Sequence, residues 1–170
     1  MRVLGIDPGI AATGYGIVES INGKSKVIDY GCIKTNKIIS FPERLKIIHD
    51  TLKKIIRKNN PDSIAIEEIF FAKNVKTAIS VGHARGVILL ACLSTGVEIA
   101  EYTPLQVKMA IVGYGRAEKY QVQQMLKTLL KLKFIPKPDD AADALAVACC
   151  HINSSGYITK RVTGGTGQKI

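Results

Sequence analysis

The chain has 170 residues, and 46% of them are hydrophobic, which is typical of one globular domain and excludes an intrinsically disordered chain. Its 24 Lys and Arg residues against 14 Asp and Glu give a formal net charge of +10. Such an excess indicates a polyanionic partner, although a solvated lysine-rich surface explains it equally well. The four cysteines lack any Cys-x-x-Cys spacing, which argues against a disulfide framework or a zinc site.

The first part of the chain predicts an antiparallel meander followed by a helix. Residues 2–6 form a short apolar strand, and residues 14–20 and 26–35 form two more, joined by the hairpin signal Asn22-Gly23. From Pro42 onward, apolar residues recur at helical spacing with lysines between them. Asn59-Asn60-Pro61 then ends this helix.

The second part predicts strands alternating with helices. Residues 64–69 are apolar on both faces, which is typical of a central parallel strand. The other predicted elements are a helix over 76–93, a strand over 97–102, and helices from 104, over 117–132 and over 140–152. The fold class is therefore α/β, with a mixed five-stranded sheet and helices on both faces. We expect one domain over 1–154 and a flexible basic tail over 155–170.

No targeting or membrane segment is predicted. The N-terminus begins directly as a strand, without the apolar region of a signal peptide. The longest apolar stretch, residues 86–93, is far too short to cross a bilayer. We expect a cytoplasmic protein.

Four carboxylates sit at the ends of apolar elements: Asp7, Glu67, Asp140 and Asp143. If the first and fourth strands are neighbours, Asp7 and Glu67 project into one crevice at their carboxyl ends. Asp140 and Asp143 are three residues apart and share a helix face, while Asp139 is available as the N-cap of that helix. Each acid alone is explained as well by a turn, a cap or a lysine partner. The four together favour a metal site.

Carboxylates gathered in one crevice repel one another, so either their pKa values rise or a cation neutralises them. Ligands that are all oxygen suit Mg²⁺ or Mn²⁺ better than zinc. Two such ions about 4 Å apart activate water and stabilise the leaving oxygen in phosphodiester cleavage. An acidic pocket in a basic chain therefore predicts metal chemistry on a polyanion.

Several motifs resemble one known family. They are Gly-Ile-Asp-Pro-Gly with Thr-Gly-Tyr-Gly within 5–16, Ala-Ile-Glu-Glu-Ile-Phe-Phe-Ala-Lys-Asn at 65–74, Gly-His-Ala-Arg-Gly-Val at 82–87 and Asp-Asp-Ala-Ala-Asp-Ala-Leu-Ala at 139–146. In this order and spacing the chain resembles the RuvC family of bacterial Holliday-junction resolvases over nearly its whole length except the tail. The resemblance implies a ribonuclease-H-like fold and a Mg²⁺-dependent endodeoxyribonuclease of recombination and repair.

The resemblance also implies roles for individual residues. The catalytic acids, which bind two Mg²⁺ ions with Mn²⁺ as a possible substitute, correspond to Asp7, Glu67, Asp140 and Asp143. Phe70 matches an aromatic residue that stacks on bases at the crossover, a contact worth roughly 1–3 kcal/mol. Lys108 and Lys119 match basic positions that contact the scissile region and neutralise its charge. None of the three histidines is predicted to be a ligand.

The implied partners are a four-way DNA junction, a second copy of the chain, and RuvA and RuvB. A junction is nearly two-fold symmetric, so a homodimer presents two identical sites to it. The apolar helix over 78–93 is a candidate interface through Ile79, Val81, Val87 and Leu90, although burial within the monomer explains it equally well.

Three alternatives use the same features differently. One is a ribonuclease-H-like nuclease with another nucleic-acid substrate, since a fold does not fix a substrate. Another is an actin-like or sugar-kinase-type nucleotide-binding domain, because residues 7–16 resemble its phosphate-binding hairpin. That class needs a second such domain, which 170 residues do not supply. The third is a junction-binding protein without catalysis, which the intact set of acids argues against.

Overall fold

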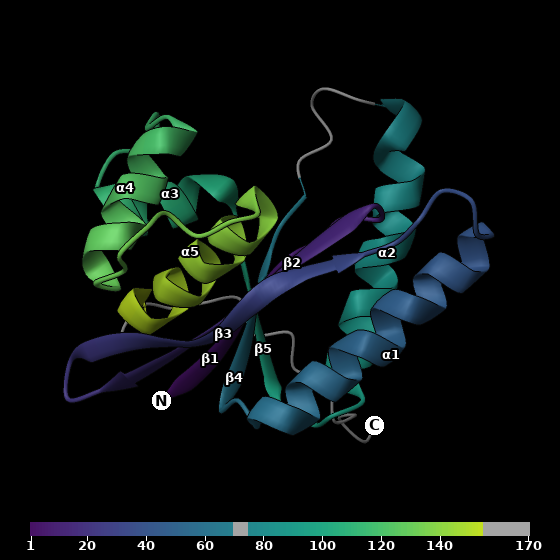
Figure 1. The fold of residues 1–170 in the computed structure, drawn as a ribbon, viewed down its shortest axis with the longest axis horizontal. Helices are drawn as coiled ribbons and strands as arrows, with labels where there is room; N and C mark the ends of the chain where they lie inside the picture. Colours follow the sequence, from purple (N-terminus) through teal and green to yellow (C-terminus); the bar gives the residue numbers. More distant parts are fainter. Residues whose placement is uncertain (70–74, 155–170) are drawn as a thin grey trace, which may run out of the picture.

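A five-stranded sheet forms the centre of the computed structural model, which describes residues 1–69 and 75–154 (Figure 1). Its strands are β1 (Arg2–Asp7), β2 (Ala12–Ile21), β3 (Lys24–Lys34), β4 (Ser63–Glu67) and β5 (Glu98–Tyr102). Their spatial order is β3-β2-β1-β4-β5. The first three strands are antiparallel, whereas β4 is parallel to both β1 and β5. The predicted mixed sheet is confirmed.

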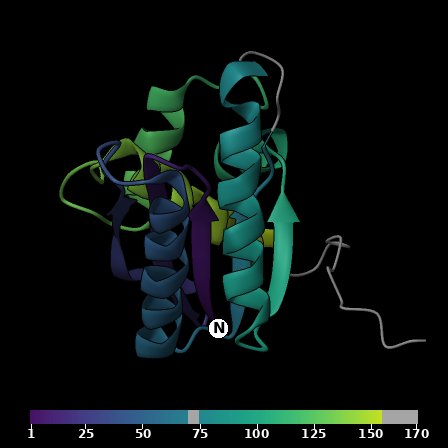
Figure 2. The ribbon, with the colours of Figure 1, turned by 90° about the vertical axis from the view of Figure 1, so that its right-hand side faces the viewer.

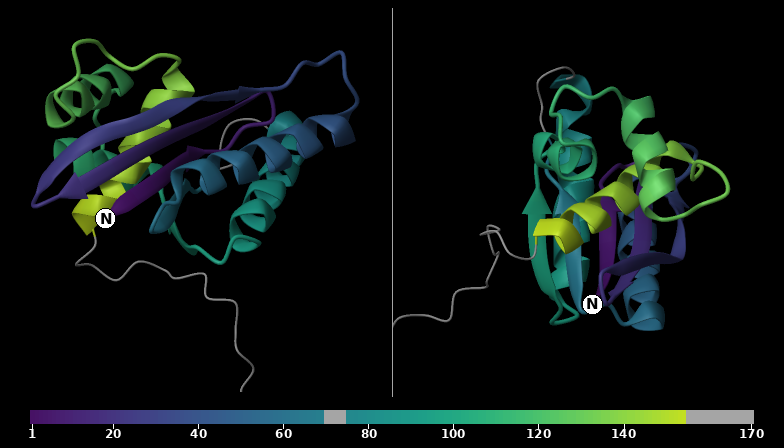
Figure 3. Two further views of the ribbon diagram at one scale, coloured as in Figure 1. Left: turned by 60° about the horizontal axis from the view of Figure 1, so that its bottom comes forward. Right: turned by 90° about the vertical axis from the view of Figure 1, so that its left-hand side faces the viewer.

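Helices cover both faces of this sheet. On one face α1 (Phe41–Asn59) and α2 (Val75–Leu93) lie side by side (Figure 2). The opposite face carries α3 (Pro104–Val112), α4 (Lys119–Leu129) and α5 (Asp139–Ser154), and α5 crosses the strands directly (Figure 3). Each face has its own apolar core, because side chains of a strand alternate between the two faces.

Local signals explain where the elements begin and end. Asn22 and Gly23 have φ values of 51° and 74°, as a tight hairpin turn requires. Ser40 and Glu43 form a capping box at the start of α1, and the left-handed Asn60 ends that helix. The helix predicted over 117–132 is shorter, because Lys131 adopts a φ of 51° just beyond α4.

The fourth strand ends at Glu67, two residues earlier than predicted. Just beyond it, the backbone N–H of Glu68 still donates a hydrogen bond to the carbonyl of Tyr102. Cys92, Cys149 and Cys150 are buried core side chains, Cys32 is half-buried, and all four are free thiols. Among residues 1–69 and 75–154, no helix combines the length and apolar character needed to cross a membrane.

Candidate active site

Asp7 and Glu67 lie next to each other at the ends of the two central strands. β1 and β4 run in parallel with Ile6 paired to Ile66, and each acid is the last residue of its strand. The two carboxyl groups interact, since the charge of Glu67 raises the pKa of Asp7. The strand order therefore brings together two acids that are sixty residues apart in the chain.

Glycines allow α5 to lie directly on the sheet and to place Asp140 in the same region. Gly14 is the register partner of Asp7, and a methyl group added at Gly14 would overlap the backbone carbonyl of Asp140. A methyl group at Gly5 would likewise overlap the carbonyl of Ala144, one turn further along α5. Side chains larger than hydrogen at these positions would push the helix off the strands. The Thr-Gly-Tyr-Gly motif thus has a packing role.

The carboxylates repel one another across this crevice. Burial, followed by the charges of Glu67, Asp143 and Asp140, raises the pKa of Asp7 far above its ordinary value of 3.8. Burial and the charge of Asp143 likewise raise the pKa of Glu67. Burial also raises the pKa of Asp143, although its hydrogen bond with Lys119 opposes the shift. Acids perturbed in this way, by burial and by one another, are typical of functional sites.

Lys119 and Lys108 supply the positive charge closest to these acids. The Nζ atom of Lys119 donates a hydrogen bond to Oδ2 of Asp143 over 2.7 Å, and the charge of Lys108 lowers the pKa of Glu67. A cavity of about 170 Å³ opens beside them between α3, α4 and α5. It is lined by Glu67, Pro104, Val107, Lys108, Lys119, Val122, Asp143 and Ala146. Two predicted acids and both predicted lysines therefore share one cavity.

The donor set suits a hard divalent cation. All four acids offer carboxylate oxygens. Burial and then mutual repulsion raise the pKa values of Asp7, Glu67 and Asp143, and a cation would offset that repulsion. Within the described residues, no three His, Cys, Asp or Glu side chains are arranged tightly enough to hold a metal as they stand. In this structure the ammonium group of Lys119 is bonded to Asp143. The chemistry of the four carboxylates, and not their spacing in this structure, fits a divalent cation.

Asp139 has a different role from the helix cap that its position indicated. α5 begins at Asp139 itself, so this residue lies in the first turn and not before it. Its carboxylate accepts a hydrogen bond from Lys137 over 2.8 Å and lies 3.7 Å from Nζ of Lys119. The sequence does contain a signal that Asp139 lies beside Asp143. The two acids are four residues apart, and such pairs share a helix face. Phe70, predicted to stack on bases, lies outside the described residues.

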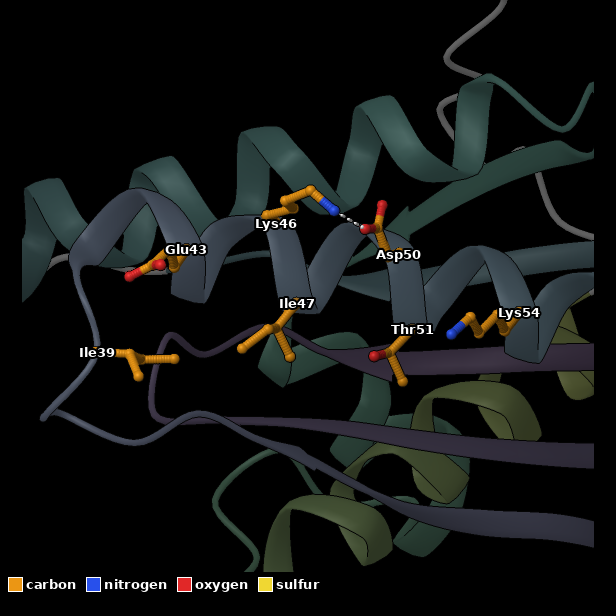
Figure 4. Close-up of a pocket in the computed structure, with 7 residues that line it drawn as sticks. All are labelled: Ile39, Glu43, Lys46, Ile47, Asp50, Thr51 and Lys54. Atoms are coloured by element: carbon orange, nitrogen blue, oxygen red, sulfur yellow. Dashed lines mark hydrogen bonds and ion pairs between the residues drawn. The ribbon is translucent and has the colours of Figure 1, made fainter.

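A second hollow, of about 410 Å³, lies on the outer surface of α1 (Figure 4). Its lining mixes charges and exposed apolar groups, with Lys46 and Asp50 paired over 2.6 Å. The lining residues are Ile39, Glu43, Lys46, Ile47, Asp50, Thr51 and Lys54. This hollow is on the face of the sheet opposite α5, so it is separate from the four acids.

A mixed sheet of this order, with carboxylates at the ends of its central strands and on a helix crossing it, defines a ribonuclease-H-like protein with an acidic active-site crevice. A family profile described as crossover junction endodeoxyribonuclease RuvC matches residues 3–151. The chain therefore belongs to the RuvC family, and the predicted ribonuclease-H-like fold is confirmed.

Close relatives support this assignment. A RuvC of Caldicellulosiruptor saccharolyticus is 60% identical over 159 residues, which cover 93% of this chain and 96% of that protein. A RuvC of Ruminiclostridium cellulolyticum is 58% identical over 154 residues, covering 91% and 93%. Thermus thermophilus RuvC has a solved structure with 36% identity and a TM-score of 0.87, covering 95% of this chain and all of that one.

A second T. thermophilus RuvC structure contains a Holliday junction substrate. It is 33% identical to this chain, with a TM-score of 0.87 over 95% of this chain and 100% of that chain. The yeast mitochondrial Holliday junction resolvase Ydc2, at 14% identity and a TM-score of 0.66, shares the fold.

Proposed function

We propose that this protein is a metal-dependent endodeoxyribonuclease that resolves Holliday junctions in DNA recombination and repair. The observation that carries the proposal is the crevice in which four carboxylates meet Lys108 and Lys119, in a chain of the RuvC family. The T. thermophilus RuvC structure with a Holliday junction substrate supports the choice of substrate. The basic chain, at +10, supports binding to phosphates.

Asp7, Glu67, Asp140 and Asp143 are the proposed ligands of a divalent metal. We expect two Mg²⁺ ions per subunit, with Mn²⁺ as a substitute, because the donors are all carboxylate oxygens. When bound, the metal supplies an activated water and neutralises charge at the scissile phosphate. The protein contributes by holding the acids at the ends of two rigid strands and one helix.

Lys108 and Lys119 are the proposed contacts to the scissile phosphate. Both line the cavity beside Glu67 and Asp143, so their ammonium groups can reach a phosphate bound at the acids. There they would stabilise the charge that develops during cleavage. Phe70 keeps its proposed role of stacking against a base at the crossover, and basic residues in the 155–170 tail are proposed to add phosphate contacts.

A homodimer follows from the symmetry of the substrate, because two matched cuts need two identical sites. α2 offers an apolar face for this contact, since Ile79 is 73% exposed and Leu90 is 61% exposed. Val81 and Val87, the other predicted interface residues, are half-buried in the monomer. We propose that Leu90→Lys shifts the protein from dimer to monomer in sedimentation velocity. By family resemblance the cellular partners are RuvA and RuvB, in the cytoplasm.

Incubation with a synthetic four-way junction and Mg²⁺ tests the function. We expect paired nicks in opposite strands that leave ligatable duplexes, with no cutting of linear duplex or of an RNA–DNA hybrid. Cleavage of the hybrid alone would favour the alternative ribonuclease-H-like nuclease. Micromolar binding of ATP without any nuclease activity would favour the nucleotide-binding alternative.

Two substitutions separate cleavage from binding. Asp7→Asn and Glu67→Gln keep the shape of each side chain but remove a metal ligand, so cleavage should be lost while junction binding is retained. Asp50→Asn is a matched control, because Asp50 lies on the outer surface of α1 (Figure 4). Full cleavage by both site variants would refute the assignment of the acids.

A further inference from the structure

Lys119 lies between two carboxylates of α5. Its Nζ atom is 2.7 Å from Oδ2 of Asp143 and 3.7 Å from Oδ2 of Asp139. Those two acids are four residues apart, so they project from the same face of the helix. Oδ1 of Asp139 accepts a hydrogen bond from Lys137 over 2.8 Å, which fixes the direction of this carboxylate. Lys119 therefore has one acceptor in contact and a second within reach.

The position of Lys119 in its own helix does not explain this arrangement. Lys119 is the first residue of α4, and a positive charge at a helix N-terminus is opposed by the helix dipole. Its stabilisation comes from α5, since the hydrogen bond and charge of Asp143 and the charges of Asp139 and Asp7 act together on the ammonium. The two helices thus meet through this lysine.

Lys119 and a metal ion would compete for Asp143. On the function proposed above, a divalent ion held by this carboxylate would repel the ammonium group bonded to its Oδ2. That repulsion would favour movement of Lys119 away from Asp143. Asp139 is better placed to receive it than to hold the metal, because its side chain is 48% exposed and already bound to Lys137.

We propose that Asp139 is a positioning residue that accepts Lys119 when a divalent metal takes Asp143. The transfer moves the ammonium group from one carboxylate to the next on the same helix face. It frees Asp143 to bind the metal and keeps the positive charge at the rim of the crevice, where a phosphate would bind. The inference rests on the proposed function, because it assumes that Asp143 is a metal ligand.

A double-mutant cycle on metal binding tests this role without any cleavage reaction. Mn²⁺ is titrated into the DNA-free protein by calorimetry, with Asp139→Asn made both in the natural chain and in a Lys119→Met background. If Asp139 receives Lys119, its loss weakens Mn²⁺ binding about two- to fivefold in the natural chain, the size of a partly exposed ion pair. With Lys119 absent, the same substitution changes nothing. Lys46→Met is the control and should leave Mn²⁺ affinity unchanged, because Lys46 pairs with Asp50 on the outer surface of α1 (Figure 4).

Each other outcome of the cycle has a defined meaning. An equal loss in both backgrounds would mean that Asp139 acts only through its general charge, which would overturn the inference. No loss in either background would overturn it as well. A natural chain that binds no Mn²⁺ would instead refute the proposed function.

Cleavage kinetics on a four-way junction provide a second readout. Asp139→Asn should lower kcat, because Lys119 is then no longer held at the crevice. KM should stay unchanged, because the rest of the basic surface still binds DNA. Asp139→Glu should restore kcat, since it keeps the charge on the same helix face. A rise in KM alone, or failure of glutamate to rescue, would assign Asp139 to binding or folding and overturn the inference.

Discussion

The hydroxyl group of Tyr102 lies 2.9 Å from Nδ1 of His151, and Nε2 of the same imidazole lies 2.9 Å from Oγ of Ser63. His151 thereby joins α5 to both β4 and β5, and Tyr102 is the register partner of Glu67. Burial lowers the pKa of His151 below 6.5, so the ring is neutral and offers one donor and one acceptor. This contact ties the helix that carries Asp140 to the strand that carries Glu67.

Replacing His151 by leucine should destabilise the protein by about 1–3 kcal/mol, because polar groups in the interior lose a hydrogen-bond partner. Urea denaturation followed by circular dichroism measures the change. His49→Leu is a suitable control, because His49 contacts Asp50 near the surface, where such pairs contribute about 1 kcal/mol or less. Equal losses in the two variants would show that the His151 contacts add nothing specific.

Gly14→Ala should damage both stability and cleavage. The added methyl group overlaps the backbone of Asp140, so α5 must shift away from the sheet. We expect a loss of about 1–3 kcal/mol in the free energy of unfolding and a marked fall in kcat, measured by thermal unfolding and junction cleavage. Gly82→Ala is the matched control, because nothing lies within 4 Å of the added methyl group and alanine favours the helix. A harmless Gly14→Ala would contradict the close approach of α5.

Without divalent metal, the protein should become less stable as the pH rises from 5 to 8.5. The folded-state pKa values of Asp7 and Glu67 are raised above their ordinary 3.8 and 4.5, so the folded state holds protons that the unfolded state has lost. That stabilisation is complete below the ordinary values and disappears as the pH passes the raised ones. Thermal unfolding in EDTA should show a smaller slope for Asp7→Asn. The difference between the two proteins isolates the site, because other groups, His151 included, contribute equally to both.

Asp7→Asn should also be more stable than the natural chain at neutral pH in EDTA. In the folded state, burial and the charges of Glu67, Asp143 and Asp140 keep the Asp7 carboxyl protonated, whereas the unfolded chain ionises it freely. Asparagine is neutral in both states and therefore avoids this cost. We expect a gain of about 1–2 kcal/mol, or about 2–8 °C in Tm for a chain of this size. A lower Tm would mean that the contacts of the Asp7 carboxyl contribute more than its burial and repulsion cost.

Added Mg²⁺ should stabilise the natural chain. A ligand present at a hundred times its Kd stabilises the folded state by about 2.7 kcal/mol, so the Tm of the natural chain should rise with Mg²⁺ concentration. Glu67→Gln, which lacks one proposed ligand, should show little or no rise in the same scan. An equal rise in both proteins would place the bound metal elsewhere.

Local features of the sequence were sufficient for most of the secondary structure. The hairpin at Asn22-Gly23, the helix beginning after Ser40 and the short apolar strands depend on neighbouring residues, whose turn and capping chemistry is the same in any fold. Some predicted helix and strand boundaries were wrong by a few residues. The helix predicted over 117–132, for example, ends at Leu129, because Lys131 has a positive φ. The four acids were proposed as site residues because a carboxylate at the end of an apolar run is unusual.

The contacts that define the site were decided by the tertiary structure. Strand order determines that Asp7 meets Glu67, and the absence of a side chain at Gly14 determines how closely Asp140 approaches. Lys119 and Asp143 are 24 residues apart, and Ser63 and His151 are 88 apart. Periodicity reports the face of an element on which a residue lies, but not which residue of another element it meets. That pairing depends on how whole layers pack. The sequence therefore indicated the chemical groups of the candidate site, while the packing of α5 and α4 on the sheet determined their partners.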